Sequence, residues 1–324
     1  MDAERKGIKT MAEVKKVATR ESYGATLAEL AAEYPNLVVL DADLAGATKT
    51  ASFKKVCPER FIDCGIAEGN MMGVAAGLAA AGMIPFASSF AMFAAGRAFE
   101  QVRNSIGYPH LNVKIGATHA GISVGEDGAT HQCCEDIALM RTIPGMVILN
   151  PCDHYEMQAA VRAAVEHKGP CYIRLGRLAV ESINNNDDYK FELGKGITLR
   201  EGTDITVVAT GLMVQEAVKA ADALKEEGIS VEVINIHTIK PLDEELVIAS
   251  AKKTGRVITV EEHNIIGGLG EAVSTALSEH CPTPVTRIGV NDVYGHSGPA
   301  VDLLKEFGLS AEHIAEVIRE KLAK

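Results

Sequence analysis

One glutamate lies at the edge of a long uncharged tract, in residues 63–70 (DCGIAEGN). From residue 69 to residue 96 the chain has no Asp, Glu, Lys, Arg or His. A carboxylate at the mouth of such a tract is expected to be shielded from water, which raises the pKa of its carboxyl group. The pattern therefore favours Glu68 as a group that shares or donates a proton. The alternative is that Glu68 only caps a helix beginning near Asn70, or pairs with a base elsewhere.

A second candidate is a polar, glycine-rich loop at residues 118–132 (THAGISVGEDGATHQ). It holds two histidines, His119 and His131, and two carboxylates, Glu126 and Asp127. The loop follows a predicted strand, and loops that leave rigid strands commonly carry functional groups. Turn formation alone would also explain the glycines.

The elements that would position these residues alternate between helix and strand. Hydrophobic spacing predicts helices over residues 23–34, 70–81 and 91–106, and strands over residues 37–40, 84–88, 112–117, 146–149 and 171–177. Asp43 follows the first of these strands, and open parallel sheets bind ligands at the carboxyl ends of their strands. The alternation predicts an α/β domain, with a parallel sheet flanked by helices on both faces.

A polar break at residues 184–188 (NNNDD) precedes a second alternating segment. Strands are predicted over residues 205–209, 231–234, 257–262 and 285–288, and a final helix over residues 311–322. We therefore divide the chain into a domain at residues 1–185, a linker at 186–202 and a domain at 203–324. Residues 267–270 (GGLG) lack the full spacing of a dinucleotide loop and are interpreted as a tight turn.

The composition is typical of a globular α/β protein, with 47% hydrophobic and 23% charged residues. The net charge of −11 disfavours nonspecific binding to nucleic acid or to anionic membranes. The uncharged tract is long enough to suggest a membrane span, but it is rich in Gly and Ala and contains Pro85, so two buried elements are predicted instead. Seven cysteines without regular spacing indicate reduced thiols in the cytoplasm, and the N-terminus has no signal-peptide pattern.

With Glu68, the histidine-containing loop and Arg177 all placed at strand ends, the first domain resembles the pyrimidine-binding domain of transketolases, which are thiamine diphosphate enzymes. Residues 65–68 (GIAE) and 125–132 (GEDGATHQ), in that order and spacing, carry the resemblance. The second domain resembles the Rossmann-like C-terminal domain of the same enzymes. The resemblance covers nearly the whole chain.

Transketolases bind the diphosphate and its metal with a Gly-Asp-Gly segment followed further along by Asn, and this chain has no such segment. Residues 126–128 with Asn150 do not match, because the first residue is Glu. The resemblance therefore implies the C-terminal half of a split transketolase. It implies a partner subunit that carries the diphosphate domain and holds Mg²⁺, with no metal ligands in this chain. An α2β2 heterotetramer is expected, because the family places the cofactor between different protomers.

The resemblance also assigns cofactor contacts. Glu68 matches the glutamate that hydrogen-bonds N1′ of the aminopyrimidine ring, a contact that requires a shared proton. Phe90 and Phe93 match the aromatic wall beside that ring, with core packing the alternative for Phe90. Gly96 stands where many transketolases have a further aromatic residue. Asp43 matches a loop carboxylate near the cofactor, although a turn residue would explain it equally well.

The substrate contacts are assigned in the same way. His131 matches the histidine that contacts the transferred two-carbon unit, and Asp127 the carboxylate that binds a donor hydroxyl. His119 is expected further along the channel. Arg20 and Arg177 match positions that hold the terminal phosphate, where the guanidinium fork binds anions well.

The family's phosphate-binding serine falls near Ala47, where Thr48 is expected to substitute. The missing serine leaves the anion open between phosphate and another group such as sulfonate. His263 and His296 lack the partner spacing of a metal site and are expected at the surface or an interface.

These assignments predict transfer of a two-carbon ketol unit from a ketose phosphate to an aldose acceptor, in carbohydrate metabolism such as the pentose phosphate pathway. Two enzyme alternatives are the β subunit of a 2-oxoacid dehydrogenase and a deoxyxylulose phosphate synthase. The two histidines that flank residues 125–128 (GEDG) favour sugar phosphate chemistry over both. A noncatalytic regulatory or scaffold subunit would need none of the candidate residues. The donor, the acceptor and the role of the C-terminal domain stay open.

Overall fold

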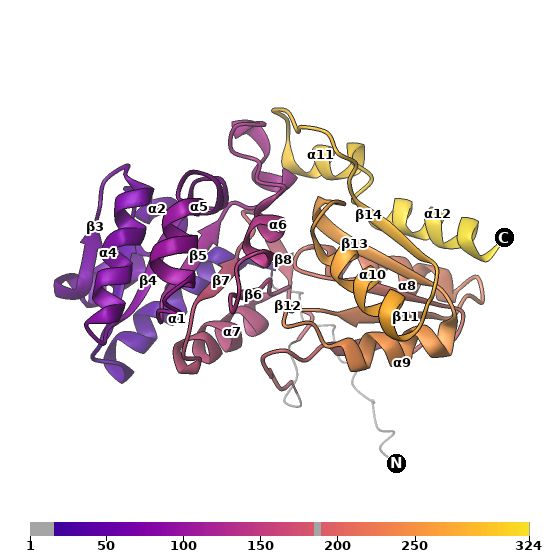
Figure 1. The fold of residues 1–324 in the computed structure, drawn as a ribbon. Helices are drawn as coiled ribbons and strands as arrows, with labels where there is room; N and C mark the ends of the chain where they lie inside the picture. Colours follow the sequence, from indigo (N-terminus) through magenta and orange to yellow (C-terminus); the bar gives the residue numbers. More distant parts are fainter. Residues whose placement is uncertain (1–15, 185–188, 324) are drawn as a thin grey trace, which may run out of the picture.

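The computed structural model describes residues 16–184 and 189–323. They form two α/β lobes that lie side by side, the first indigo to magenta and the second orange to yellow (Figure 1). The N-terminal segment, where no signal-peptide pattern is found, and residues 185–188 of the predicted break lie outside the described residues.

The first lobe is built on a sheet of seven strands in the order β12-β6-β7-β5-β4-β2-β3. Its pairings are parallel except that of β12 with β6. Strands buried on both faces form continuous apolar runs, which is why the sequence predicts them. The strands are β2 (Leu37–Asp41), β3 (Phe61–Asp63), β4 (Ile84–Phe90), β5 (Lys114–Thr118), β6 (Val147–Leu149), β7 (Cys171–Arg174) and β12 (Thr238–Lys240).

Helices cover both faces of this sheet, as predicted. One face carries the mutually packed helices α1 (Thr19–Glu33), α3 (Ala51–Val56) and α7 (His154–Glu166). The other carries α4 (Glu68–Ala80) and α6 (Asp136–Arg141). Shorter pieces are α2 (Ala45–Thr48), η1 (Pro58–Arg60), η4 (Ile122–Asp127) and an antiparallel ribbon of β1 (Lys16–Ala18) with β8 (Ala179–Glu181).

The helix predicted over residues 91–106 is wider than a regular α-helix. It consists of the π-helical segments η2 (Met92–Arg97) and η3 (Val102–Gly107), joined by α5 (Phe99–Gln101). π-helical turns are rare and are often found at functional sites. Two residues of the candidate site, Phe93 and Arg97, lie on η2.

The second lobe has five strands in the order β14-β13-β10-β11-β9, all parallel except β9. The predicted strands appear as β10 (Ile205–Ala209), β11 (Val231–Asn235), β13 (Val257–Asn264) and β14 (Val285–Val290). The edge strand β9 (Ile197–Arg200) lies in the segment interpreted as a linker. The helices are α8 (Met213–Lys225), α9 (Glu244–Thr254), α10 (Leu269–His280), α11 (Ala300–Glu306) and α12 (Ala311–Leu322).

The uncharged tract forms elements of the first lobe. Most of residues 69–96 lie in α4, β4 and η2, and all but the first residue of β4 are buried. Within the described residues, no helix is long and apolar enough to cross a membrane. The prediction of two buried elements is therefore confirmed.

A buried polar cluster joins the two lobes at Glu156 on α7. Its Oε1 accepts hydrogen bonds from Asn235 Nδ2 of β11 at 2.7 Å and from the Tyr189 hydroxyl at 3.1 Å. Its Oε2 accepts from the Cys152 backbone N–H at 2.7 Å. Burial raises the pKa of Glu156 from 4.5 to about 7, although these donors oppose the shift.

This raised pKa predicts a loss of stability with rising pH. Between about pH 4.5 and pH 7 the unfolded chain releases the Glu156 proton while the folded chain keeps it, so the free energy of unfolding falls by about 3 kcal/mol. Urea unfolding at a series of pH values should show this loss in the wild type and not in Glu156→Gln. Parallel stability curves for the two proteins would contradict the prediction.

Candidate active site

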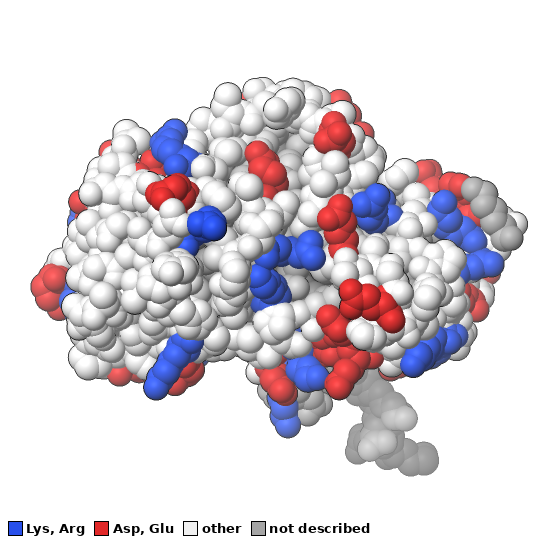
Figure 2. Space-filling model, in the orientation of Figure 1, with Lys and Arg blue, Asp and Glu red and all other residues white. Residues whose placement is uncertain are grey.

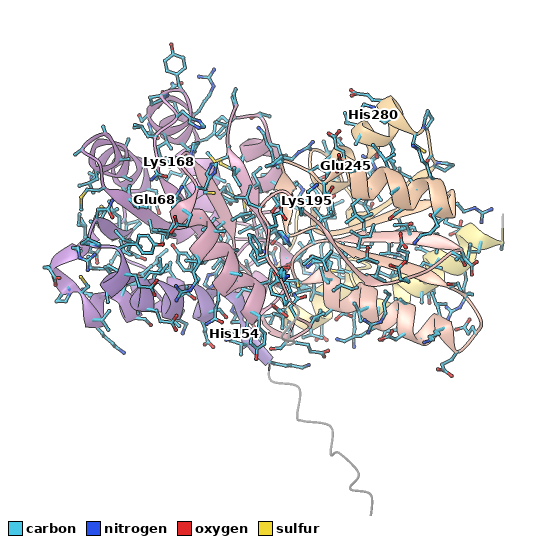
Figure 3. The ribbon with its side chains drawn as sticks, turned by 90° about the horizontal axis from the view of Figure 1, so that it is seen from below. Glu68, His154, Lys168, Lys195, Glu245 and His280 are labelled. Carbon is cyan, nitrogen blue, oxygen red and sulfur yellow. The ribbon has the colours of Figure 1, made fainter. Side chains whose placement is uncertain are left out.

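Glu68 is the first residue of α4 and is 1% exposed (Figure 3). Its Oε2 accepts a hydrogen bond from Arg97 Nη1 at 2.9 Å. Arg97 is the first charged residue after the uncharged tract, so the base that the alternative interpretation requires comes from the far end of that tract. Among the described residues, Arg97 is the only side chain that hydrogen-bonds the Glu68 carboxylate. Proton sharing by Glu68 stays a prediction.

A row of rings continues from this ion pair. The Arg97 guanidinium lies over the Phe93 ring, 4.4 Å from its centroid, as in a cation–π contact. Phe93 stacks with Phe90 at 6.0 Å between centroids, and Phe90 stacks with His119 at 3.9 Å. Phe90 is buried and Phe93 is partly exposed. Residues from α4, η2, β4 and the loop after β5 therefore form one continuous line.

The glycine-rich loop returns to this row through His131. The His131 ring meets Phe93 edge-on at 5.3 Å and Phe90 at 6.2 Å between centroids. Its Nδ1 lies 2.9 Å from the Thr130 hydroxyl. Asp127 lies on the same loop and is exposed. The structure thus brings His131 to the aromatic pair, while Asp127 makes no contact with the row.

The far end of the row is basic. Arg20 Nη1 lies 3.3 Å from His119 Nε2 and donates to the Ala47 carbonyl at 2.9 Å. Burial, together with the charges of Arg20 and Arg177, lowers the pKa of His119 to about 3. His119 is therefore neutral at physiological pH, and the positive charge at this end belongs to the two arginines.

Arg177 is held by the glycine-rich loop. Its Nη1 donates to the Val124 carbonyl at 2.8 Å and pairs with Glu126 Oε2 at 2.7 Å. Glu126 is exposed, so an anionic ligand would compete with a carboxylate that has little burial to hold it. The sequence analysis did not identify this pairing, although Glu126 is one of the two loop carboxylates.

Thr48 requires a correction. Its side chain is fully buried, and its hydroxyl donates to Asp41 Oδ2 at 2.7 Å and lies 3.1 Å from the Thr50 hydroxyl. The buried Asp41 carboxylate needs such donors, because an unsatisfied buried charge is costly. The Thr48 hydroxyl therefore points into the fold and does not replace the phosphate-binding serine.

Asp43 and two histidines complete the inventory. Asp43 is exposed in a left-handed conformation (φ 61°), and its N–H donates to Asp63 Oδ1 at 3.2 Å, which is typical of a turn. His263 was expected at a surface but is fully buried, with Nδ1 2.6 Å from the Asn264 carbonyl. His296 is exposed and pairs with Glu306 at 3.2 Å. No group of three His, Cys, Asp or Glu among the described residues could hold a metal ion.

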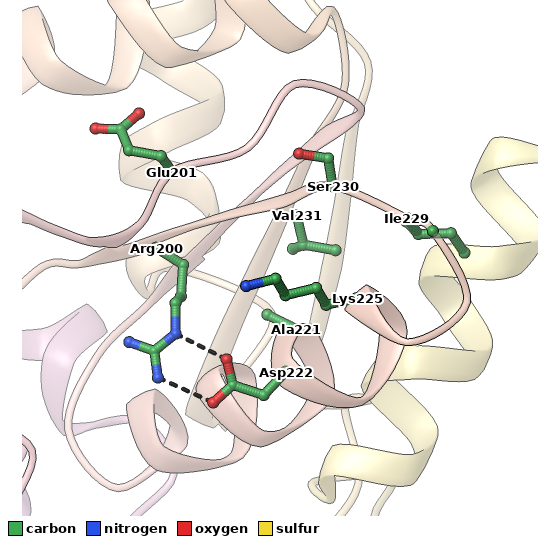
Figure 4. Close-up of a pocket in the computed structure, with 9 residues that line it drawn as sticks. Arg200, Glu201, Ala221, Asp222, Lys225, Ile229, Ser230 and Val231 are labelled. Carbon is green, nitrogen blue, oxygen red and sulfur yellow. Dashed lines mark hydrogen bonds and ion pairs between the residues drawn. The ribbon is translucent and has the colours of Figure 1, made fainter.

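A cavity of about 250 Å³ lies on the second lobe, away from these residues (Figure 4). Arg200 and Asp222 face it and bind each other through two hydrogen bonds of 2.8 and 2.9 Å. The guanidinium is therefore already paired with a carboxylate. We assign no part of the site to this cavity.

Comparison with known proteins follows the division of the chain into two lobes. The pyrimidine-binding domain model of transketolase matches residues 15–182, and the transketolase C-terminal domain model matches residues 194–314.

Two relatives match along almost their whole length. A protein of Methanocaldococcus jannaschii named "Putative transketolase C-terminal section" is 54% identical over 307 residues, which cover 94% of this chain and 96% of that protein. The 6-deoxy-6-sulfo-D-fructose transketolase subunit SqwH of a Clostridium species is 46% identical, with 93% of each chain covered. Human transketolase is 39% identical, and the match spans 95% of this chain but 50% of the human protein.

A solved structure described as a split gene transketolase, inactive beta4 tetramer, superposes with a TM-score of 0.88 at 52% identity. The match covers 95% of this chain and 99% of that one. The architecture is therefore that of the pyrimidine-binding and C-terminal domains of thiamine diphosphate enzymes. The chain belongs to the transketolase family. Within that family it corresponds to the C-terminal section of a split transketolase.

Membership of this family implies dependence on thiamine diphosphate, and the residues present fit its pyrimidine end. The Glu68 carboxylate is buried, and Arg97 bonds only its Oε2, which leaves Oε1 to meet a ring nitrogen. The stacked pair of Phe90 and Phe93 follows in the same row and offers apolar surface to an aromatic ring.

Proposed function

We propose that this chain is the C-terminal subunit of a thiamine diphosphate-dependent transketolase that moves a two-carbon ketol unit from a ketose phosphate to an aldose acceptor. The observation that carries the proposal is the continuous row of contacts from Glu68 to Arg20. It places a buried carboxylate at one end, aromatic rings in the middle and a basic group at the other end. A cofactor ring and a sugar with a terminal anion need these three environments in this order.

Each end of the row has a separate task. Thiamine diphosphate, when bound, supplies the nucleophilic carbon and the electron sink. Glu68 would hold a proton at the pyrimidine nitrogen, in a site from which water is largely excluded. His131, edge-on to both phenylalanines, is positioned to orient the transferred unit, and Asp127 would bind a donor hydroxyl.

The basic end selects the anion of the sugar. Arg20 and Arg177 present guanidinium groups beside a neutral His119, so they can form charge-assisted hydrogen bonds to a phosphate. The names of two relatives refer to a sulfonated sugar and to apulose 4-phosphate. The buried Thr48 supplies no hydroxyl here, so phosphate and sulfonate are the two donor classes to compare.

The diphosphate and Mg²⁺ are assigned to a partner subunit, in an α2β2 assembly. On the face seen in Figure 2, the first lobe is largely uncharged where α4 and α5 lie in Figure 1. Ile66 and Tyr108 are 77% and 89% exposed, which suits a surface that a partner covers. We further propose a cytoplasmic location, supported by seven unpaired cysteines, and a place in carbohydrate metabolism such as the pentose phosphate pathway.

The test is a donor panel on the chain combined with a diphosphate-domain subunit, thiamine diphosphate and Mg²⁺. Xylulose 5-phosphate, its sulfonate analogue and pyruvate are offered with ribose 5-phosphate as the acceptor. Ketol transfer from either sugar supports the proposal and identifies the anion. Release of CO₂ from pyruvate without ketol transfer would instead identify a 2-oxoacid dehydrogenase subunit.

A further inference from the structure

The loop that carries Asp127 and His131, here called the substrate loop (residues 119–132), has little regular structure of its own. It contains the short helix η4 and three glycines with positive φ, Gly121, Gly125 and Gly128. Its inner part is buried, whereas Asp127 at its outer end is exposed. The contacts of the inner part therefore determine where Asp127 and His131 lie.

One of these contacts comes from the second lobe. Glu262 on β13 accepts a hydrogen bond at its Oε1 from the Ser123 backbone N–H, at 2.6 Å. The carboxylate lies against Gly121, where an added Cβ would come within 2.4 Å of Oε1. Glu262 is 3% exposed, so this charge-assisted hydrogen bond is shielded from water.

Buried charges hold Glu262 in place. Arg174 on β7 donates to the Glu262 carbonyl at 2.8 Å and pairs with Asp136 Oδ2 at 2.9 Å. Burial raises the pKa of the Glu262 carboxyl, while the Arg174 charge and the Ser123 N–H oppose that shift. The carboxylate is thus fixed by both lobes before it meets the loop.

The second lobe also closes over the outer part of the loop. Gln132 Nε2 donates to the His296 carbonyl at 3.0 Å, and an added Cβ on Gly128 would lie 2.5 Å from Ser297 Oγ. Helix α11 packs on η4 and lies beside the loop in Figure 1. The substrate loop is therefore held between β13 and the segment that leads into α11.

We propose that Glu262 is a positioning residue for the transferase reaction: from the second lobe it holds the substrate loop so that Asp127 and His131 meet the donor sugar. This assigns the C-terminal domain a part in substrate binding. The inference rests on the proposed function, because Asp127 and His131 contact a sugar only if the chain is a transketolase subunit.

Glu261, the preceding residue on β13, supplies a matched control. It is also fully buried, and its carboxylate accepts hydrogen bonds from the backbone N–H groups of Leu269 at 2.6 Å and Gly270 at 2.8 Å. These bonds cap α10 within the second lobe and do not touch the substrate loop. Loss of either carboxylate leaves buried N–H groups without an acceptor, so both substitutions cost stability.

The experiment compares Glu262→Ala with Glu261→Ala in the full chain by hydrogen exchange of residues 119–132. Glu262→Ala should speed exchange of the loop by about tenfold or more, and Glu261→Ala should leave it unchanged. In the assembled enzyme, Glu262→Ala should raise KM for the donor by about tenfold without weakening thiamine diphosphate binding, since only the loop has moved. The Gln variants form a milder pair if an Ala variant fails to fold.

Unchanged loop exchange in the Glu262 variant, or equal changes in both variants, would overturn the inference. The exchange readout needs no turnover. A wild-type complex without ketol transfer would therefore refute the proposed function, while the exchange result would still decide whether Glu262 holds the loop.

Discussion

Glu68→Gln is expected to lower the rate of ketol transfer by about 10²–10⁴-fold and to leave the free energy of unfolding nearly unchanged. Glutamine keeps the size of the side chain and can still accept the Arg97 hydrogen bond seen at 2.9 Å. It cannot hold or release the proton that the pyrimidine nitrogen requires. Steady-state kinetics of the assembled enzyme and urea unfolding of the chain measure the two effects.

Asp63→Asn serves as the control for this experiment. Asp63 is exposed and close in sequence, and its Oδ1 accepts only from the backbone N–H groups of Gly65 at 3.0 Å and Asp43 at 3.2 Å. The Asn variant should retain near wild-type turnover. Wild-type turnover in Glu68→Gln would remove Glu68 from the mechanism.

Arg20→Gln is expected to raise KM for a phosphorylated donor by about ten- to hundredfold, the loss that follows when a charge-assisted hydrogen bond is removed. Glutamine can still donate to the Ala47 carbonyl, so the fold around His119 should persist. Turnover at saturating donor should change little, because the anion lies at the far end of the row from Glu68.

The dephosphorylated donor ketose separates this effect from general damage. The wild type and Arg20→Gln should use it equally poorly, because neither can gain from the missing anion. Arg200→Gln is the matched arginine control, since Arg200 pairs with Asp222 on the second lobe, outside the site. An equal rise of KM for both donors in Arg20→Gln would show that Arg20 does not bind the terminal anion.

The core of each sheet could be predicted from the sequence, because strands buried on both faces form short apolar runs between turn residues. β10, for example, has the predicted bounds Ile205–Ala209. The antiparallel edge strands β9 and β12 were not predicted. They have three or four residues each, β9 is half-exposed, and β12 joins the sheet of the other lobe, so local periodicity does not reveal them.

The contacts of the site were harder to predict than its members. Glu68, Phe93 and His131 come together as expected, but the Glu68–Arg97 pair depends on how a π-helical segment turns its side chains. Thr48 was misassigned because a hydroxyl beside the expected position carries no information about which way it faces. The buried Asp41 carboxylate, which sets that direction, is visible only in three dimensions.

The most direct test of the split assignment is ketol transfer by this chain alone, by a diphosphate-domain subunit alone and by their mixture, each with thiamine diphosphate and Mg²⁺. A relative that superposes on 95% of this chain is described as an inactive tetramer of a single subunit type. We predict no turnover by either subunit alone and xylulose 5-phosphate-dependent transfer by the mixture. Strong transfer by this chain alone would contradict the account, because the diphosphate and its metal would then be held without a partner.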